Sequence, residues 1–270
     1  MGKEQETQKS IKQNHSVAIK NITHIYNDSV HALNDIDISL LEGEFFTTIG
    51  PSGCGKTTLM DIVAGLTEPT SGEVYFENKK VFGEVPEGVG VVFQDDASFP
   101  WLSVWENIAF GLRRAGKNSS EIKDKVDYAI NFMGLGGFEK ARPSELSGGM
   151  RQRVCIARTF VLEPRLILLD EPFGSLDQQT RFFMGDELLR LWRETGATVM
   201  LITHSLDEAA LLSDRIGIMS SRPGQFMDVI KTNWSIDRDS KMATSPEFRK
   251  ITSLLWEKLR KESEKALGDN

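Results

Sequence analysis

The chain has 270 residues, of which 40% are hydrophobic and 23 are glycine, with 32 basic against 39 acidic side chains. This composition is that of an ordinary globular protein, so it excludes a disordered chain, a collagen helix and a coiled-coil rod. The net charge of −7 argues against non-specific nucleic-acid binding, because a surface with that task has to neutralise phosphates.

The cysteine count and the hydropathy pattern narrow the cellular setting. Cys54 and Cys155 cannot form a disulfide framework, and no Cys/His cluster has the spacing of a metal site. No apolar run approaches the roughly 18 residues that cross a bilayer, and the polar amino terminus is unlike a secretory signal. We therefore expect a cytoplasmic protein in which residues 1–15 form a disordered tail.

The first predicted elements are strands. Three runs rich in β-branched and aromatic residues, at 17–26, 31–40 and 44–49, are separated by turn residues. The third runs directly into a glycine-rich segment and then a helical pattern at 57–66, and further short strands are expected over 66–93.

From about residue 100 to 160 the apolar spacing is typical of helices. Helices are expected to begin at Ser103, where a glutamate three residues later completes a capping box, at Ser119 and near Ser147.

The remaining sequence alternates as βα units do. It begins with a continuous apolar run of the kind found in buried parallel strands. The expected elements are strand 165–170, helix 178–195, strand 197–204, helix 206–213, strand 215–220 and a last helix with Ser245 as N-cap and Pro246 at its first position. The pattern predicts an α/β core that a mainly helical stretch interrupts.

The segment GPSGCGKTT matches the full phosphate-loop (P-loop) pattern G-x-x-x-x-G-K-[ST], and it lies between a predicted strand and a predicted helix. Backbone N–H groups of such a loop wrap a phosphate, and the helix N-terminus adds the positive end of its dipole. The lysine reaches the β and γ phosphates, and the first threonine ligates Mg²⁺. The predicted nucleotide-binding residues are Gly50, Pro51, Ser52, Gly53, Cys54, Gly55, Lys56, Thr57 and Thr58.

Asp170 and Glu171 stand at the carboxyl end of the predicted buried strand, where α/β sheets bind ligands. Asp170 is placed to hold Mg²⁺ through water, and Glu171 to orient or deprotonate an attacking water. The alternative is a strand that ends in two solvated acids. The P-loop upstream favours the catalytic interpretation.

The segment LSGGMRQR at 146–153 is a second Gly-Gly loop that opens a helix, and hence a second potential anion cradle. In isolation a capped helix start is the simpler interpretation. Because one nucleotide rarely needs two cradles from one chain, the segment hints at a site shared between chains.

These motifs occur in order together with Gln94, Ser175-Leu176-Asp177 and His204. In this combination the chain closely resembles, over about residues 17–222, the nucleotide-binding subunit of ATP-binding cassette (ABC) transporters. The segment LSGGMRQR separates this family from other P-loop ATPases.

The resemblance implies an α/β fold: a P-loop NTPase (RecA-like) core with an antiparallel β subdomain and an inserted helical subdomain. Its implied divisions are an ABC ATPase domain over 16–240, a helical insertion at about 96–160 and a C-terminal helical extension over 241–270.

By the same resemblance, Tyr26 stacks on adenine, although a tyrosine here can equally be a core residue. Gln94 contacts Mg²⁺ and the attacking water, and it couples the site to a membrane partner. Glu171 is the catalytic base, His204 contacts the γ-phosphate and Glu171, and Lys56 completes the catalytic set.

The family pattern also assigns residues to a neighbouring subunit's site. Ser147, Gly148 and Gly149 would complete the ATP site of the opposite subunit, and Asp177 lies in the loop that crosses to it. The implied working unit is a head-to-tail dimer.

Two features stay open. Trp101 and Trp105 stand four residues apart and can share a helix face, so core packing and a docking groove are both compatible with them. For Arg151, Arg153 and Arg158 the simpler interpretation is helix solvation with ion pairs.

Only 91 residues separate Lys56 from Ser147, which leaves no room for the long coiled coil of chromosome-maintenance relatives. One cassette without a fused membrane domain favours a separate importer subunit. FQDDASFPWLSVWENIAFGL and LSDRIGIMSSRPGQ resemble the nitrate/sulfonate/taurine branch, although Asp95-Asp96 depart from its pattern. The segment after Pro223, about 48 residues, is too short for the regulatory domain of sugar-importer cassettes.

The implied cofactors are ATP and Mg²⁺. The implied partners are a second ATP-binding subunit, an integral membrane permease and, indirectly, a periplasmic or lipid-anchored solute-binding protein, at the cytoplasmic face of the inner membrane. The expected solute is nitrate, a sulfonate, taurine or a similar small organic molecule. The alternative is a soluble ABC-type ATPase module that drives a non-transport partner.

Overall fold

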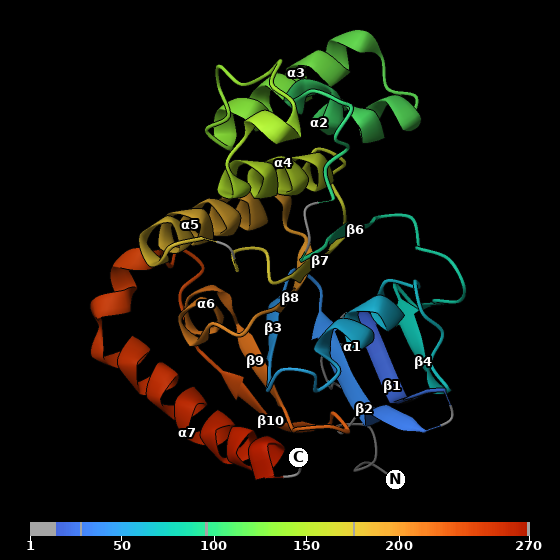
Figure 1. The fold of residues 1–270 in the computed structure, drawn as a ribbon, viewed down its shortest axis with the longest axis vertical. Coiled ribbons are helices and arrows are strands. Elements are labelled where there is room, and N and C mark those ends of the chain that lie inside the picture. The colour runs from blue at the N-terminus through green and yellow to red at the C-terminus, as the bar shows by residue number, and fades with distance from the viewer. Residues whose placement is uncertain (1–14, 28, 95–96, 175, 269–270) are drawn as a thin grey trace, which may run out of the picture.

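A computed structural model describes residues 15–27, 29–94, 97–174 and 176–268. The tail expected over 1–15, apart from His15, and the positions Asp95, Asp96 and Ser175 lie outside the described residues. Two β-sheets stand side by side, and helices cover the larger one and extend beyond one end of it (Figure 1).

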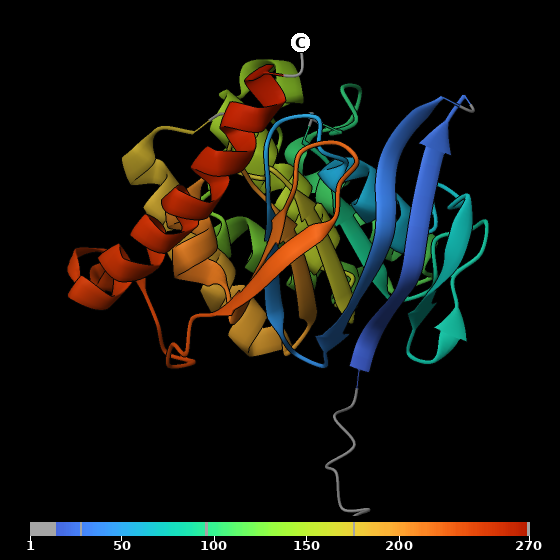
Figure 2. The same ribbon diagram turned by 90° about the horizontal axis from the view of Figure 1, so that it is seen from below.

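The smaller sheet is antiparallel, and it confirms the first two predicted strands. Its order is β2-β1-β4-β5, and the long β1 and β2 form a hairpin that is prominent in Figure 2. The strands are β1 (His15–Tyr26), β2 (Val30–Leu41), β4 (Ser71–Phe76) and β5 (Lys79–Lys80).

The larger sheet has the order β10-β9-β3-β8-β7-β6, and only β10 runs antiparallel to its neighbour. Its strands are β3 (Phe45–Ile49), β6 (Val89–Val92), β7 (Leu166–Asp170), β8 (Thr198–Ile202), β9 (Arg215–Met219) and β10 (Phe226–Lys231). Every residue of β3, β7 and β8 is buried, as expected for parallel strands covered on both faces.

The register of these strands brings distant motifs together. Ile202 of β8 pairs with Thr48 of β3 on one side and with Asp170 of β7 on the other. The P-loop after β3, the acids at the end of β7 and the residues after β8 therefore meet at one carboxyl edge, where α/β sheets bind ligands.

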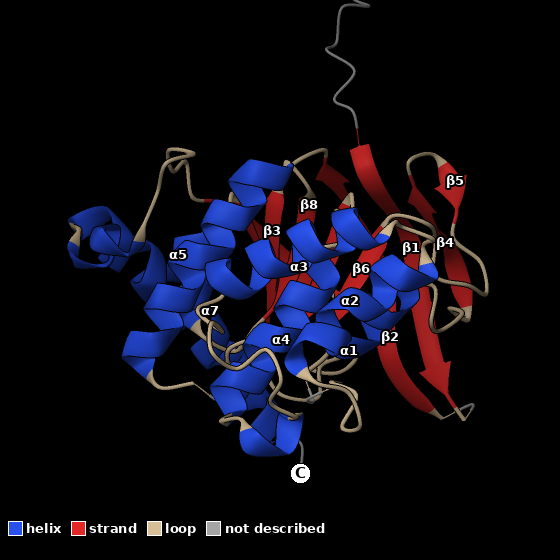
Figure 3. Ribbon diagram, turned by 90° about the horizontal axis from the view of Figure 1, so that it is seen from above, coloured by secondary structure: helices blue, strands red, loops and turns tan. Residues whose placement is uncertain are grey.

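Three helices, α2, α3 and α4, lie together at one end of the molecule (Figures 1 and 3). The predicted capping box at Ser103 and Glu106 is present, and α3 begins at Ser119 as predicted, with Asn118 as its N-cap. The helices are α1 (Lys56–Val63), α2 (Val104–Arg114), α3 (Ser119–Phe132), α4 (Gly148–Phe160), α5 (Gln178–Thr195), α6 (Leu206–Leu212) and α7 (Pro246–Gly268), with 3₁₀ turns η1 (Pro143–Glu145) and η2 (Ser240–Thr244).

Two hydrophobic cores form on opposite faces of the larger sheet. Phe45 packs in the core that includes residues of α2 to α6, whereas its neighbour Phe46 packs in the core shared with α1 and the smaller sheet. This alternation follows from the two-residue period of a strand. The arrangement confirms the predicted fold class, while the domain boundaries stay a prediction.

Three expectations need correction. The strand β10 was not predicted, because its residues are only partly buried and show no clear alternation. Trp101 precedes α2 and is 68% exposed, so it does not share a helix face with Trp105, whose indole donates to Asp127. Arg153 and Arg158 are half-buried and donate to backbone carbonyls, in place of the expected solvated helix face.

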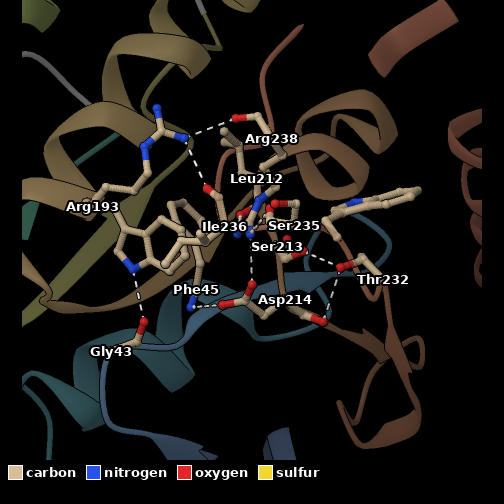
Figure 4. Close-up of polar contacts among 12 residues, drawn as sticks. Gly43, Phe45, Arg193, Leu212, Ser213, Asp214, Thr232, Ser235, Ile236 and Arg238 are labelled. Atoms are coloured by element: carbon tan, nitrogen blue, oxygen red, sulfur yellow. Dashed lines mark hydrogen bonds and ion pairs between the residues drawn. The ribbon is translucent and has the colours of Figure 1, made fainter. Parts of the chain in front are cut away.

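The segment between β10 and α7 is fastened to the core by a buried arginine (Figure 4). The Arg238 guanidinium pairs with Asp214 at 2.9 Å and donates to the Leu212 carbonyl, and burial lowers its pKa. From α5, Arg193 donates to the carbonyls of Ile236 and Arg238 at 3.1 Å.

The last helix, α7, packs against α6 and β9 through Phe248 and Leu255, which are both buried. The predicted cap is confirmed, since the Ser245 hydroxyl accepts from the Phe248 N–H at 3.1 Å. Within the part of the chain that the structure describes, no helix combines the length and the apolar character needed to cross a membrane.

Candidate nucleotide site

A cavity of about 440 Å³ opens at the carboxyl edge of the larger sheet. It brings together Tyr26, most of the P-loop, Gln94, Glu171 and His204, as the sequence predicts, and adds Ala32 and Arg222. A larger hollow of about 630 Å³ lies at the opposite, amino edge, near Arg165 and Thr198, and it contains none of the predicted residues.

The P-loop is already shaped for an anion. The Lys56 ammonium donates to the carbonyls of Gly50 and Pro51, each at 2.9 Å, which holds the lysine folded over the loop. Gly55 precedes α1 with φ of 104° and gives no side-chain cap, so the first N–H groups of the helix stay available to a phosphate. A Cβ at Gly55 would lie 2.8 Å from the Ala32 carbonyl oxygen.

The cysteine in this loop, Cys54, is not among the residues that line the cavity. Cys54 is buried, its sulfur lies 3.8 Å from the Lys56 nitrogen, and burial raises the pKa of the thiol. A buried neutral thiol is a poor nucleophile.

Thr57 lines the cavity, and its hydroxyl donates to Oδ2 of Asp170, which is not itself a lining residue, at 2.9 Å. Asp170 is 3% exposed, burial raises its pKa, and its other oxygen, Oδ1, has no hydrogen-bond partner. No cluster of three or more His, Cys, Asp or Glu side chains suited to a metal occurs among the described residues. The donor set fits Mg²⁺ all the same, because that ion binds one or two carboxylates together with substrate phosphates.

Glu171 is held by two side chains from neighbouring strand ends. Its Oε2 accepts from Gln94 Nε2 at 3.2 Å and lies 3.0 Å from His204 Nδ1. Its backbone has φ of 44°, unusual for a residue with a side chain, and its N–H donates to the Ile202 carbonyl at 2.8 Å. Strained backbone of this kind concentrates at functional sites.

Tyr26 is a wall of the cavity rather than a core residue, because it is 41% exposed. Its hydroxyl lies 3.1 Å from the Thr58 hydroxyl, and its ring is nearly perpendicular to the His24 ring, with the two ring centroids 4.4 Å apart. These two contacts fix the ring plane at the mouth of the cavity.

The predicted second cradle does not join this cavity. Ser147 caps α4 by accepting from the Met150 N–H, and Ser147 and Gly148 are exposed. A Cβ on Gly149 would lie 2.7 Å from Leu176. None of the three lines the cavity, and Asp177, which caps α5, does not either.

Arg222 is a cavity residue to which the sequence assigned no role. It stands in the segment LSDRIGIMSSRPGQ, which carries part of the resemblance to one importer branch. The position of Arg222 inside this segment is the sequence signal that could have marked it as a site residue.

The profile of the ABC transporter family matches residues 33–174, more than half of the chain. The chain belongs to the ABC transporter family, as one of its ATP-binding subunits, and it is an ATPase.

Relatives match over nearly their full length. An uncharacterised ABC transporter ATP-binding protein of Methanocaldococcus jannaschii is 42% identical, and the match covers 93% of this chain and 94% of the relative. A taurine import ATP-binding protein of Pelagibacter ubique is also 42% identical, over 85% of this chain and 89% of its own.

Solved structures agree with the fold. A dimeric ATP-binding cassette in a post-hydrolysis state, bound to ADP and Pi, is 31% identical, with a TM-score of 0.72 over 81% of this chain and 100% of its own. The protein cbiO1 of Clostridium perfringens, part of an ABC transporter complex, is 26% identical, with a TM-score of 0.74 over 90% of this chain and 99% of its own.

Proposed function

We propose that the chain hydrolyses ATP in the cavity at the P-loop and thereby powers an importer for taurine or a similar small sulfonate. The observation that carries the proposal is the convergence of the P-loop, Glu171, His204 and Gln94 on one cavity. The similarity to taurine import ATP-binding proteins supports the choice of solute class.

In this proposal Glu171 accepts a proton from water. The water oxygen forms a bond to the γ-phosphorus, the bond from that phosphorus to the ADP oxygen breaks, and ADP leaves with Lys56 beside its phosphates. His204 and Gln94 hold the Glu171 carboxylate in place. Thr57, Asp170 and Gln94 would hold Mg²⁺, which neutralises phosphate charge when it is bound.

We infer that two copies act head to tail. Ser147, Gly148 and Gly149 do not line the cavity of their own chain, yet they form a helix start suited to an anion, at which Ser147 and Gly148 are exposed. In the dimer each copy would present them to the partner's nucleotide. The dimeric state of a related cassette supports this arrangement.

A trans-complementation experiment tests the shared site. Lys56→Ala inactivates the P-loop of the chain that carries it, and Ser147→Arg blocks the cradle of the chain that carries it. Each homodimer has the substitution in both copies and is therefore expected to be inactive. A mixed dimer keeps one intact pair, and mixing the variants is expected to restore part of the ATPase activity. No recovery in a verified mixed dimer would contradict sharing.

A membrane permease is the proposed mechanical partner. Trp101 and Phe110 are 68% and 45% exposed, and the ring of Phe99 contacts both of their rings. Gln94 precedes this segment and donates to Glu171, so a movement of the segment when a permease docks would be passed to the active site. Membrane association and a solute-binding protein follow as further parts of the proposal.

Co-purification with the permease tests the transport role. ATPase activity of the complex in vesicles is expected to rise with taurine and a loaded binding protein, and less with nitrate. A cassette that copurifies with no permease, and whose activity no solute changes, would favour the non-transport alternative.

A further inference from the structure

The turn between β9 and β10 touches the P-loop. The Arg222 guanidinium donates through Nε and Nη2 to the Gly53 carbonyl oxygen, at 3.2 and 3.0 Å. No carboxylate among the described residues forms an ion pair with Arg222, and its side chain lines the nucleotide cavity. A positive charge therefore stands at the mouth of a site for a polyphosphate.

A second contact from the same turn is made by backbone. A Cβ on Gly224 would collide with the Cys54 carbonyl oxygen, so only glycine allows this approach. The Gly224 N–H donates to the Ala32 carbonyl at 2.9 Å, and its own carbonyl accepts from the Asn34 N–H at 3.0 Å. The turn is thus packed against both the P-loop and β2.

The end of α7 holds this turn from the other side. Glu262 is 4% exposed, and its Oε2 accepts from the Ser221 N–H at 3.2 Å and lies 3.5 Å from the Ser221 hydroxyl. One turn earlier Lys258 pairs with Asp228 of β10 at 2.8 Å. Figure 1 shows α7 alongside the β9–β10 side of the sheet.

These contacts form a continuous path from α7 to the phosphate loop. Glu262 accepts a hydrogen bond from Ser221, the next residue along the chain is Arg222, and Arg222 donates to the Gly53 carbonyl. Arg222 is 169 residues from Gly53 along the chain, and Glu262 is 41 residues from Ser221, so only the fold creates the path.

We propose that α7 braces the nucleotide site, with Glu262 positioning the Ser221–Gly224 turn and Arg222 positioning the P-loop for nucleotide. The proposal rests on the nucleotide site described above. It gives the C-terminal helix a role in ATP affinity rather than in the chemical step. Arg222 and Glu262 are accordingly positioning residues, whose loss changes binding more than turnover.

The test measures the Kd of the purified full-length chain for a fluorescent ATP analogue, together with KM and kcat for ATP. Arg222→Ala is expected to weaken binding about 10- to 150-fold, the range for loss of a hydrogen bond to a charged group. Arg222→Lys keeps the charge and one donor and is expected to weaken it less. In both variants kcat at saturating ATP stays within about twofold of wild type, as expected for lost uniform binding.

Glu262→Ala tests the far end of the path. It is expected to weaken binding in the same direction, whereas Glu262→Gln keeps an acceptor for the Ser221 N–H and stays near wild type. The double variant Arg222→Ala/Glu262→Ala is expected to bind no more weakly than Arg222→Ala alone, because the two residues act in series. Fully additive effects would overturn the link between them.

Matched controls are Arg260→Ala and Glu257→Ala, which remove exposed charges from α7 itself. If Glu262→Ala lowers stability, hydrogen exchange of residues 50–55 gives an independent measure, and faster exchange in a folded sample supports the brace. A wild-type chain that does not bind ATP overturns the nucleotide site. If the wild-type chain binds ATP and the Kd is unchanged in both Arg222→Ala and Glu262→Ala, the proposed role of α7 is overturned while the nucleotide site stands.

Discussion

The Nδ1 of His204 lies 3.0 Å from Glu171 Oε2, the same oxygen that accepts from Gln94. The three residues follow the ends of three neighbouring strands: Glu171 follows β7, His204 follows β8 and Gln94 follows β6. In the proposed reaction, the Glu171 carboxylate held in this way is the group that accepts a proton from water.

Glu171→Gln is expected to keep ATP affinity within a few-fold while lowering turnover by about 10²–10⁴, the contribution of a positioned acid–base group. The amide preserves shape and the contact with His204 but cannot take the proton. Phosphate release and ATP binding measure the two effects, with Glu264→Gln on exposed α7 as control. Near-normal turnover would refute the assignment of the base.

Lys56→Ala is expected to weaken ATP binding by at least tenfold, because the loop loses both its cation and the ammonium bonds to Gly50 and Pro51. Titration calorimetry with ATP and ADP measures the loss. Lys123→Ala removes an equivalent charge from the surface of α3, where it pairs with Asp127, and is expected to change nothing. Tight ATP binding by Lys56→Ala would count against the P-loop site.

Asp170→Asn is expected to stabilise the nucleotide-free protein while impairing its response to Mg²⁺. Burial raises the pKa of Asp170, so the folded chain becomes less stable as the carboxyl ionises with rising pH through that raised pKa. Below its ordinary pKa of about 4 the carboxyl is protonated in both states, and the substitution changes little.

At pH 7.5 the Asp170→Asn variant is expected to unfold about 2–4 °C higher, equivalent to roughly 1 kcal/mol in a chain of this size. Differential scanning calorimetry at pH 3.5 and 7.5, with Asp124→Asn as an exposed control, measures the difference. The extra stabilisation that Mg²⁺ adds to ATP is expected to shrink. A lower unfolding temperature at pH 7.5 would contradict the unfavourable burial of this carboxylate.

Two variants of Tyr26 distinguish the contribution of ring stacking to ATP affinity from that of the hydroxyl's hydrogen bond. Tyr26→Phe removes only the contact with Thr58 and is expected to leave ATP affinity close to wild type. Tyr26→Ala removes the ring and is expected to cost about 1–3 kcal/mol, the range for a base on an aromatic platform. Inorganic triphosphate has no base, so its affinity should not change, and an equal loss for both ligands would contradict stacking on adenine.

The sequence predicted the residues of the cavity well, because most of its chemistry lies in short contiguous motifs. Lys56 and Thr57 are neighbours in one loop, and Asp170 and Glu171 end one apolar strand. Such segments carry their own geometry through glycines, a strand end and a helix start. The α/β core followed from the alternation of strands and helices, whereas the antiparallel β subdomain followed from the resemblance to the family.

Other features depended on partners far along the chain. The strand β10 exists because β9 offers an edge to it, and its own residues show little periodicity. Trp101 and Trp105 were separated by the start of α2 between them, which their spacing alone does not reveal. Arg222 gained a place in the cavity only because its turn packs against Gly53.

By itself the sequence determined the ATPase family, which rests on several short motifs in a fixed order. It also determined the phosphate loop and the acid pair, because each consists of neighbouring residues whose local conformation fixes their geometry. The tertiary structure decided which side chains share the cavity and that Ser147 and Gly149 stay outside it. It also decided that Glu262 reaches the turn between β9 and β10, which in turn contacts Gly53. Those relationships arise from strand register and packing, which join segments that no local pattern connects.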